Sequence, residues 1–163
     1  MSYKSALSLI RVLVGLLFVA HGTQLLFGWF GGAGLAGTIK LTEALGLRPA
    51  PFWGLLAALS QFGGGLLLLL GLLHPLGALA VMGAMLVAIL KVHLTHGFWI
   101  ASGGLEYALL LFLLAGILGL AGPGSYALDN RLSLRLPRPL SFWAGLAAMI
   151  LVIGIGVASS STA

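Results

Sequence analysis

Residues 52–93 have the sequence FWGLLAALSQFGGGLLLLLGLLHPLGALAVMGAMLVAILKVH. This stretch is almost entirely apolar and has one clear interruption. The hydrocarbon core of a bilayer requires about 20 consecutive apolar residues per helix. Two runs that approach this length, at about 52–73 and 76–93, flank the dipeptide His74-Pro75. Because proline cannot continue a helix, this dipeptide ends the first run. The stretch therefore predicts two membrane-spanning helices joined by a tight turn.

The composition of the whole chain agrees with this interpretation. Of the 163 residues, 60% are hydrophobic and 7% are charged, whereas a soluble domain carries roughly 25% charged residues. An integral membrane protein surrounded by lipid is therefore expected. The net charge of +5 does not indicate nucleic-acid binding, because the basic residues are scattered at the ends of apolar runs. The absence of cysteine excludes disulfides and thiolate chemistry in this chain.

Three further apolar runs, at about 6–27, 104–121 and 140–158, bring the expected number of membrane-spanning helices to five. The first run has features of a signal peptide, but no A-x-A cleavage site follows it and Arg11 interrupts it. We therefore expect a retained first span. Gly122-Pro123-Gly124 ends the fourth run, because proline stops a helix and glycine tolerates the turn.

The segment between the first two spans, residues 29–51, is expected to contain a short helix. Leu35, Ile39 and Leu45 have roughly helical spacing, whereas Lys40 and Glu43 fall off that stripe. This pattern predicts a helix that lies in the membrane interface or folds back over the bundle.

Lysine and arginine in the short loops predict the orientation, because cytoplasmic loops carry an excess of both. Placing the N-terminus in the cytoplasm leaves three basic residues outside: Lys40, Arg48 and Lys91. It puts the remaining basic residues inside: Lys4, Arg11, Arg131, Arg135 and Arg138. The expected location is the inner (cytoplasmic) membrane. Five spans put the C-terminus outside, whereas it lies inside if the last apolar run does not cross.

This orientation brings polar side chains from four spans to one level, in the outer half of the membrane. Ionisable groups within a bilayer are costly, so each requires a partner or a purpose. The residues at this level are His21, Gln24, Gln61, Lys91, His93, His96, Glu106 and Tyr107.

Each of these groups taken singly has an ordinary structural explanation. Lys91 can extend its ammonium group to the interface, Glu106 can interact with a helix dipole, and His96 can be a solvated loop residue. The convergence of His21, Gln61, His93 and Glu106 from four helices is harder to explain in this way. It indicates a polar site.

A quinone fits the chemistry of such a site. A neutral histidine and a carboxylate can hydrogen-bond quinone oxygens and move protons, so the candidate catalytic residues are His93 and Glu106. The candidate ligand-binding residues are His21, Gln61, Lys91, His96, Trp99 and Tyr107. The rings of Trp99 and its neighbours could flank a flat ligand or belong to the aromatic belt of the interface. No metal, haem or nucleotide cofactor is expected, since the histidine spacing matches no strong metal motif.

Four segments of the chain form a recognisable pattern: RVLVGLLFVAHGTQLLFGWFGG (11–32), QFGGGLLLLLGLL (61–73), KVHLTHGFWIASGGLEYALLL (91–111) and GPGSYALDNRL (122–132). Together they resemble the DoxX family of small bacterial and archaeal membrane proteins. The resemblance implies an all-α, four-helix membrane bundle over residues 1–132. Residues 133–163 then form a basic linker, an additional transmembrane helix and a polar tail. The resemblance also implies a role in quinone-linked sulfur oxidation, as a subunit of a thiosulfate:quinone oxidoreductase, or in membrane complexes dealing with oxidative stress.

The family's recurrent polar positions fall here on Arg11, His21, Gln61, His93, Glu106 and Asp129. Of these, Arg11 and Asp129 are assigned structural roles. The position of Gln61 usually resembles a glutamate in the family, so a proton-carrying group is absent here.

Two functional hypotheses follow. The first is a quinone-interacting membrane subunit of an oxidoreductase system, with its polar site in the outer leaflet. The second is a non-catalytic accessory or assembly subunit that braces a larger membrane complex. Both require other membrane protein subunits as partners, and whether the chain is itself an enzyme stays open. A transporter is disfavoured, because we find no internal repeat and the polar groups lie towards one side.

Overall fold

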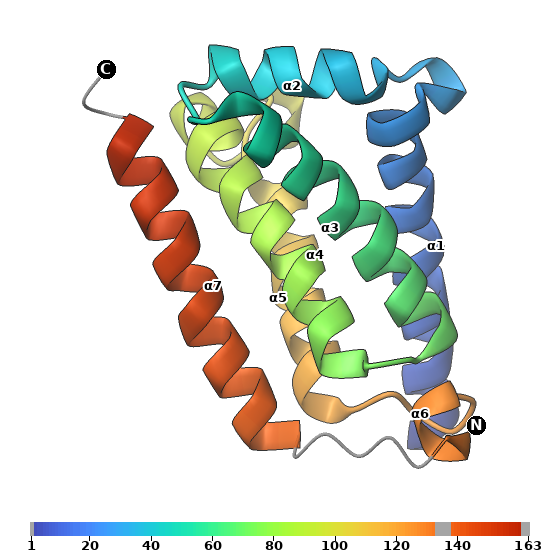
Figure 1. Cartoon of the computed structure of the whole chain (residues 1–163). Coiled ribbons are helices and arrows are strands. Elements are labelled where there is room, and N and C mark those ends of the chain that lie inside the picture. Colours follow the sequence, from blue (N-terminus) through green and yellow to red (C-terminus); the bar gives the residue numbers. More distant parts are fainter. Residues whose placement is uncertain (1, 133–137, 161–163) are drawn as a thin grey trace.

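The computed structural model describes residues 2–132 and 138–160, and within these ranges the regular structure is helical (Figure 1). The helices are α1 (Tyr3–Phe27), α2 (Gly34–Ala44), α3 (Ala50–Leu70), α4 (His74–Ala88), α5 (Glu106–Ala121), α6 (Leu128–Arg131) and α7 (Arg138–Ser160). The predicted linker segment 133–137 and the last residues of the predicted tail, 161–163, lie outside the described residues.

Four helices are long and apolar enough to cross a bilayer: Tyr3–Phe27, Ala50–Leu70, His74–His96 and Leu140–Ser160. An all-helical membrane bundle is thereby confirmed. The fourth predicted span corresponds to α5, which has 16 residues. At 1.5 Å per residue, a helix of this length covers about 24 Å of a hydrocarbon core about 30 Å thick. The predicted total of five crossings therefore stays a prediction.

Glycines allow α1 and α3 to pack with their backbones in contact. A methyl group added at Gly22 would lie 2.4 Å from Phe62 Cα, and one added at Gly65 would lie 2.7 Å from the backbone nitrogen of Val19. Gly64 instead faces α4, where an added methyl group would lie 2.9 Å from the side chain of Ala80. In lipid, such small residues permit the close contacts on which helix association depends. Gly64 and Gly65 of α3 are therefore packing surfaces, whereas a methyl group added at Gly63 would meet no atom within 4 Å.

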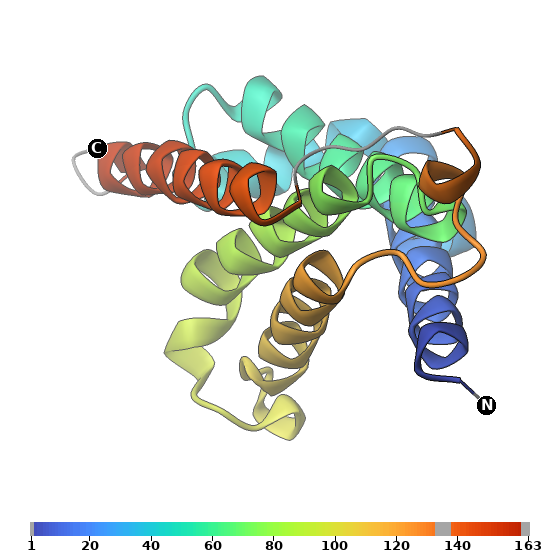
Figure 2. The same ribbon diagram turned by 90° about the horizontal axis from the view of Figure 1, so that it is seen from below.

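The core lies between α1, α3, α4 and α5, and Figure 2 shows these helices around it. Phe18, Leu68, Val81 and Leu118 are among its buried side chains, and each comes from a different helix. α7 packs beside α4 (Figure 2), with Leu79 of α4 against Gly145, and near its beginning it touches α5, with Phe142 against Gly119.

α2 lies across one end of the bundle, where α1 ends and α3 begins (Figure 1). Two buried threonines attach it there. The hydroxyl of Thr38 donates to the carbonyl of Leu25 in α1 (3.1 Å), and that of Thr42 donates to the carbonyl of Ala50 in α3 (3.0 Å). The helix expected within residues 29–51 is therefore present, whereas its position in the membrane interface stays a prediction.

Arg11 joins three segments at the opposite end of the bundle. Its guanidinium group is 1% exposed and donates to the carbonyls of Leu69 (2.7 Å), Pro123 (2.9 Å) and Tyr126 (2.7 Å), in addition to that of Leu68. The side chain thus connects α1 to the end of α3 and to the loop after α5.

Candidate functional site

The helical geometry of α4 changes where the predicted site begins. The α-helix gives way to a π-helical turn over Ile89–His93 and then to a 3-10 turn over Leu94–His96. Single π-helical turns within α-helices are rare and frequently occur at functional sites. The irregular backbone at Lys91 and His93 therefore supports a site in this segment.

The two histidines of this segment contact its own backbone. Nδ1 of His93 lies 2.7 Å from the carbonyl oxygen of Gly103, and Nδ1 of His96 lies 2.9 Å from that of Val92. A carbonyl oxygen only accepts hydrogen bonds, so Nδ1 carries the proton in both rings. In the neutral ring, Nε2 is then the acceptor. Each imidazole thus keeps one nitrogen with an available lone pair.

Backbone hydrogen bonds close the turn between α4 and α5. The N–H of Leu105 donates to the carbonyl of Gly97 (3.1 Å), and that of Glu106 donates to the carbonyl of Phe98 (2.9 Å). The half-buried Glu106 is the first residue of α5, where the helix dipole favours a negative charge. The turn thus holds a histidine and a carboxylate at the facing ends of two helices.

His21 and Gln61 lie apart from this turn. They flank the point where Gly22 of α1 crosses Phe62 of α3. His21 is exposed, with its ring 6.4 Å from that of Phe18, and Gln61 is half-buried in the middle of α3. These two residues therefore form a second group, on the α1 and α3 side of the bundle.

Lys91 faces a third direction. Its ammonium group donates to the hydroxyl of Ser160 at the end of α7. Trp99 is 68% exposed and packs edge-to-face on Phe98, and Tyr107 is also exposed. Among the described residues, no hydrogen bond joins two of the predicted site side chains. Within the described part of the chain, no three His, Cys, Asp or Glu residues are grouped so that they could hold a metal ion.

The sequence interpretation missed His74. This residue begins α4 and is fully buried, and its Nε2 atom lies 2.8 Å from the carbonyl oxygen of Leu118 in α5. The available signal was a histidine between two apolar runs. Because Pro75 follows it, the pattern indicates only a turn at this position.

A sequence model of the DoxX family matches residues 6–94, more than half of the chain. The matched range extends from α1 to the π-helical turn and includes His21, Gln61, Lys91 and His93. No curated protein and no solved structure matches the chain.

Proposed function

Because the chain belongs to the DoxX family and is a multi-pass membrane protein, we propose that it is a quinone-interacting subunit of an oxidoreductase system. The observation that carries this proposal is the π-helical turn with His93, placed opposite Glu106 at the start of α5. We further propose that the protein lies in the inner membrane with its N-terminus in the cytoplasm. The site then lies in the outer leaflet.

The hydrogen-bond acceptors of the turn fit the hydroxyl groups of a quinone head group in its reduced, quinol form. Gly103 fixes the His93 tautomer, so Nε2 can accept a hydrogen bond from a hydroxyl group or take up its proton. Glu106 supplies a second proton acceptor at the same turn. Phe98 and Trp99 provide apolar ring surface beside them.

A bound quinone supplies the two-electron, two-proton chemistry. His93 and Glu106 then accept or return the protons, and the backbone bonds of the turn keep the imidazole in place. The chain itself has no redox centre, so the electrons would have to pass directly between a substrate and the quinone, or come from a partner subunit.

Quinone binding by the purified protein tests this proposal. Titration with a short-chain ubiquinol, the reduced form whose hydroxyl groups can donate to Nε2, followed by tryptophan fluorescence, would compare the wild type with His93→Ala. Loss of one hydrogen bond of about 1 to 1.5 kcal/mol predicts a five- to tenfold weaker affinity. Thr95→Ala, an exposed change in the same turn, is the control and should leave the affinity unchanged. Equal affinities of the wild type and His93→Ala would remove His93 from the site.

A second candidate is a non-catalytic accessory subunit of a larger membrane complex. Gln61 favours it, because this residue cannot carry a proton where the family usually has a glutamate. In this case the chain co-purifies with other membrane subunits after gentle solubilisation of the native membrane. Recovery of the chain only as a free small bundle would count against this function.

A further inference from the structure

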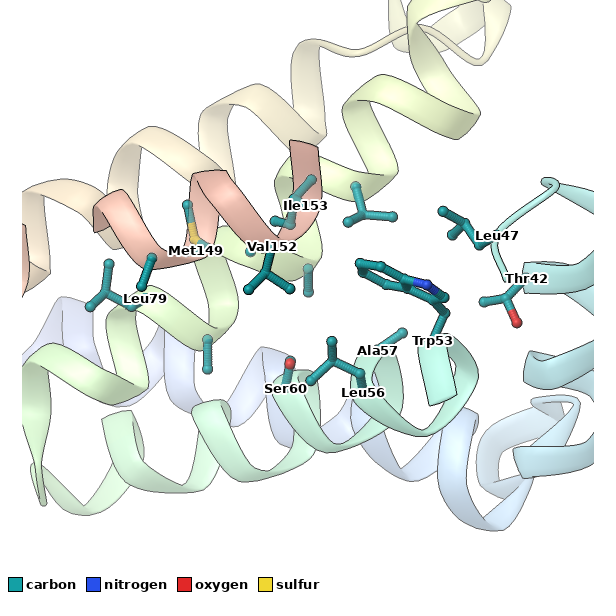
Figure 3. Close-up of a pocket in the computed structure, with 15 residues that line it drawn as sticks. Thr42, Leu47, Trp53, Leu56, Ala57, Ser60, Leu79, Met149, Val152 and Ile153 are labelled. Carbon is teal, nitrogen blue, oxygen red and sulfur yellow. The ribbon is translucent and has the colours of Figure 1, made fainter. Parts of the chain in front are cut away.

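An apolar groove lies between α3, α4 and α7, and has a volume of about 280 Å³. Figure 3 shows its wall, to which α3 contributes Trp53 and Leu56, α4 contributes Leu79, and α7 contributes Met149 and Val152. An apolar cavity of about 150 Å³ already accommodates benzene. The groove is therefore large enough for a segment of hydrocarbon chain.

Most polar side-chain atoms in the wall are hydrogen-bonded to backbone carbonyl groups. The hydroxyl of Thr42 donates to the carbonyl of Ala50, and Nε1 of Trp53 donates to the carbonyl of Arg48 (3.2 Å). Ser60 adds one further hydroxyl. The groove therefore offers hydrocarbon contacts and few hydrogen bonds, which favours an aliphatic chain over a polar ligand.

Two cationic residues lie at the end of the groove nearest α2. Lys91 follows the lining residue Val87 by one helical turn, and the exposed Arg48 follows the lining residue Leu47. The ammonium group of Lys91 has three donors and gives one to Ser160, and the described part of the chain leaves the other two for an anion. Hydrocarbon contacts with cations at one end complement a lipid that carries a negative head group.

The groove and the proposed quinone site lie on different sides of α4. Lys91 and His93 are two residues apart, and such positions do not share a helix face. Lys91 bonds to Ser160 of α7, whereas His93 bonds to Gly103 ahead of α5. A ligand in the groove is therefore distinct from a quinone head group at His93.

We infer that the groove binds one acyl chain of an anionic phospholipid, with the phosphate held by Lys91 and Arg48. The acyl chain fills the space between α7 and the helices α3 and α4, and so joins α7 to the bundle. This lipid site requires only that the helices lie in a membrane, and it does not depend on the proposed quinone chemistry.

Native mass spectrometry of the full-length protein in detergent tests the inference, with added palmitoyl-oleoyl phosphatidylglycerol or phosphatidylcholine. The wild type should retain one phosphatidylglycerol per chain in preference to phosphatidylcholine. Lys91→Gln should lower that preference about fivefold, the contribution of one cation near an anionic lipid surface. Lys91→Arg should keep it. Lys4→Gln is the matched control: Lys4 lies in the first turn of α1, at the other end of the bundle from Lys91, and its replacement should have no effect.

A second variant tests the acyl chain. Ala148 lines the groove from α7 and is exposed, so Ala148→Phe should fill the space and reduce retention of both lipids. Ala147→Phe introduces the same ring at an exposed α7 position outside the groove and should retain lipid normally. The inference is overturned if Ala148→Phe binds lipid as the wild type does, or if Lys91→Gln keeps the full preference. Displacement of the lipid by ubiquinone would also overturn it, because the groove would then belong to the quinone.

Discussion

Arg11 shows how a charged residue can be accommodated inside a membrane bundle. It lies near the beginning of an apolar run, and its guanidinium group donates to carbonyls from two other segments. The carbonyls of Leu68 and Leu69 belong to the last turn of α3, where helices leave carbonyl groups without intrahelical partners. The carbonyl of Leu68 also accepts the N–H of Gly71, so Arg11 matters most as the donor to the carbonyls of Leu69, Pro123 and Tyr126.

Removing this donor should destabilise the protein strongly. Arg11→Met keeps an unbranched side chain but removes the guanidinium group, which leaves several buried carbonyls without this donor. The free energy of unfolding should therefore fall by about 3 kcal/mol or more. The measurement is unfolding of the purified protein in detergent, followed by circular dichroism. Arg131→Met removes an exposed arginine near the same end and should change stability by less than about 0.5 kcal/mol. Similar losses in the two variants would contradict this role of Arg11.

The location of the candidate turn was predictable at the residue scale, but its geometry was not. His93 ends one apolar run and Glu106 lies at the start of the next, so the sequence places both residues at the same end of the bundle. The different directions of Lys91 and His93 depend on partners far along the chain, Ser160 and Gly103. They also depend on a π-helical turn, in which each hydrogen bond spans one residue more than in an α-helix. The spacing of apolar residues in the sequence does not reveal such a turn. The hydrogen-bond partners of Lys91 and His93 therefore could not be predicted from the sequence.

At the scale of an element, the start of α4 depends on a distant side chain. Asp129 is 6% exposed, and its carboxylate accepts the backbone N–H groups of Leu73 (2.8 Å) and His74 (3.0 Å). Such side chains satisfy the first N–H groups of a helix. The helix itself was predicted from its apolar run. Its cap was not, because Asp129 lies more than 50 residues further along the chain.

Variants of Asp129 should separate hydrogen bonding from charge. Asp129→Ala removes both acceptors and should lower the free energy of unfolding by about 1 to 2 kcal/mol. Asp129→Asn keeps one acceptor oxygen and should be less destabilising. Chemical denaturation in mixed micelles would measure both changes. The Asp129 carboxylate also interacts electrostatically with Arg11. If Asp129→Asn were as destabilising as Asp129→Ala, this charge interaction would matter more than the cap.

α7 is held against the bundle at sites where a side chain meets a glycine. A methyl group added at Gly156 would lie 2.0 Å from the indole ring of Trp53, whereas one added at Gly154 would meet no atom within 4 Å. Gly156→Ala should therefore displace α7, and hydrogen exchange of the α7 amides should become faster. Gly154→Ala is the matched control, and should be neutral or stabilise the helix by up to about 1 kcal/mol. Equal exchange rates in the two variants would show that Trp53 does not fix the position of α7.

At the scale of the whole molecule, the charges and the helix order determine the expected orientation. Lys4 and Arg131 lie at the end of the bundle that holds α6, and Arg138 begins α7. Arg135 of the predicted basic cluster lies outside the described residues. The other end carries Lys40, Arg48 and Lys91. The excess of lysine and arginine at the α6 end is modest, and it predicts the orientation of the bundle. It does not determine the number of crossings.

The number of crossings is testable, because α7 determines on which side the chain ends. The apolar part of α7, Leu140–Ser160, has 21 residues and covers about 32 Å, enough to cross the hydrocarbon core. The structure places Ser160 at the same end of the bundle as Gly46 and Lys91, opposite the N-terminus (Figure 1). An alkaline phosphatase fused after residue 163 should therefore be active outside the cytoplasm. The same reporter fused after residue 132, before α7, should be inactive, and a fluorescent protein fused there should fluoresce.

The two fusion points differ only by the segment that contains α7, so each controls for the other. Inactive phosphatase at both points would mean that α7 does not cross and that the chain has four spans. Active phosphatase after residue 132 would instead reverse the whole orientation. In that case the turn with His93 and Glu106 would lie in the inner leaflet, because α4 and α5 meet at the opposite end of the bundle from residue 132.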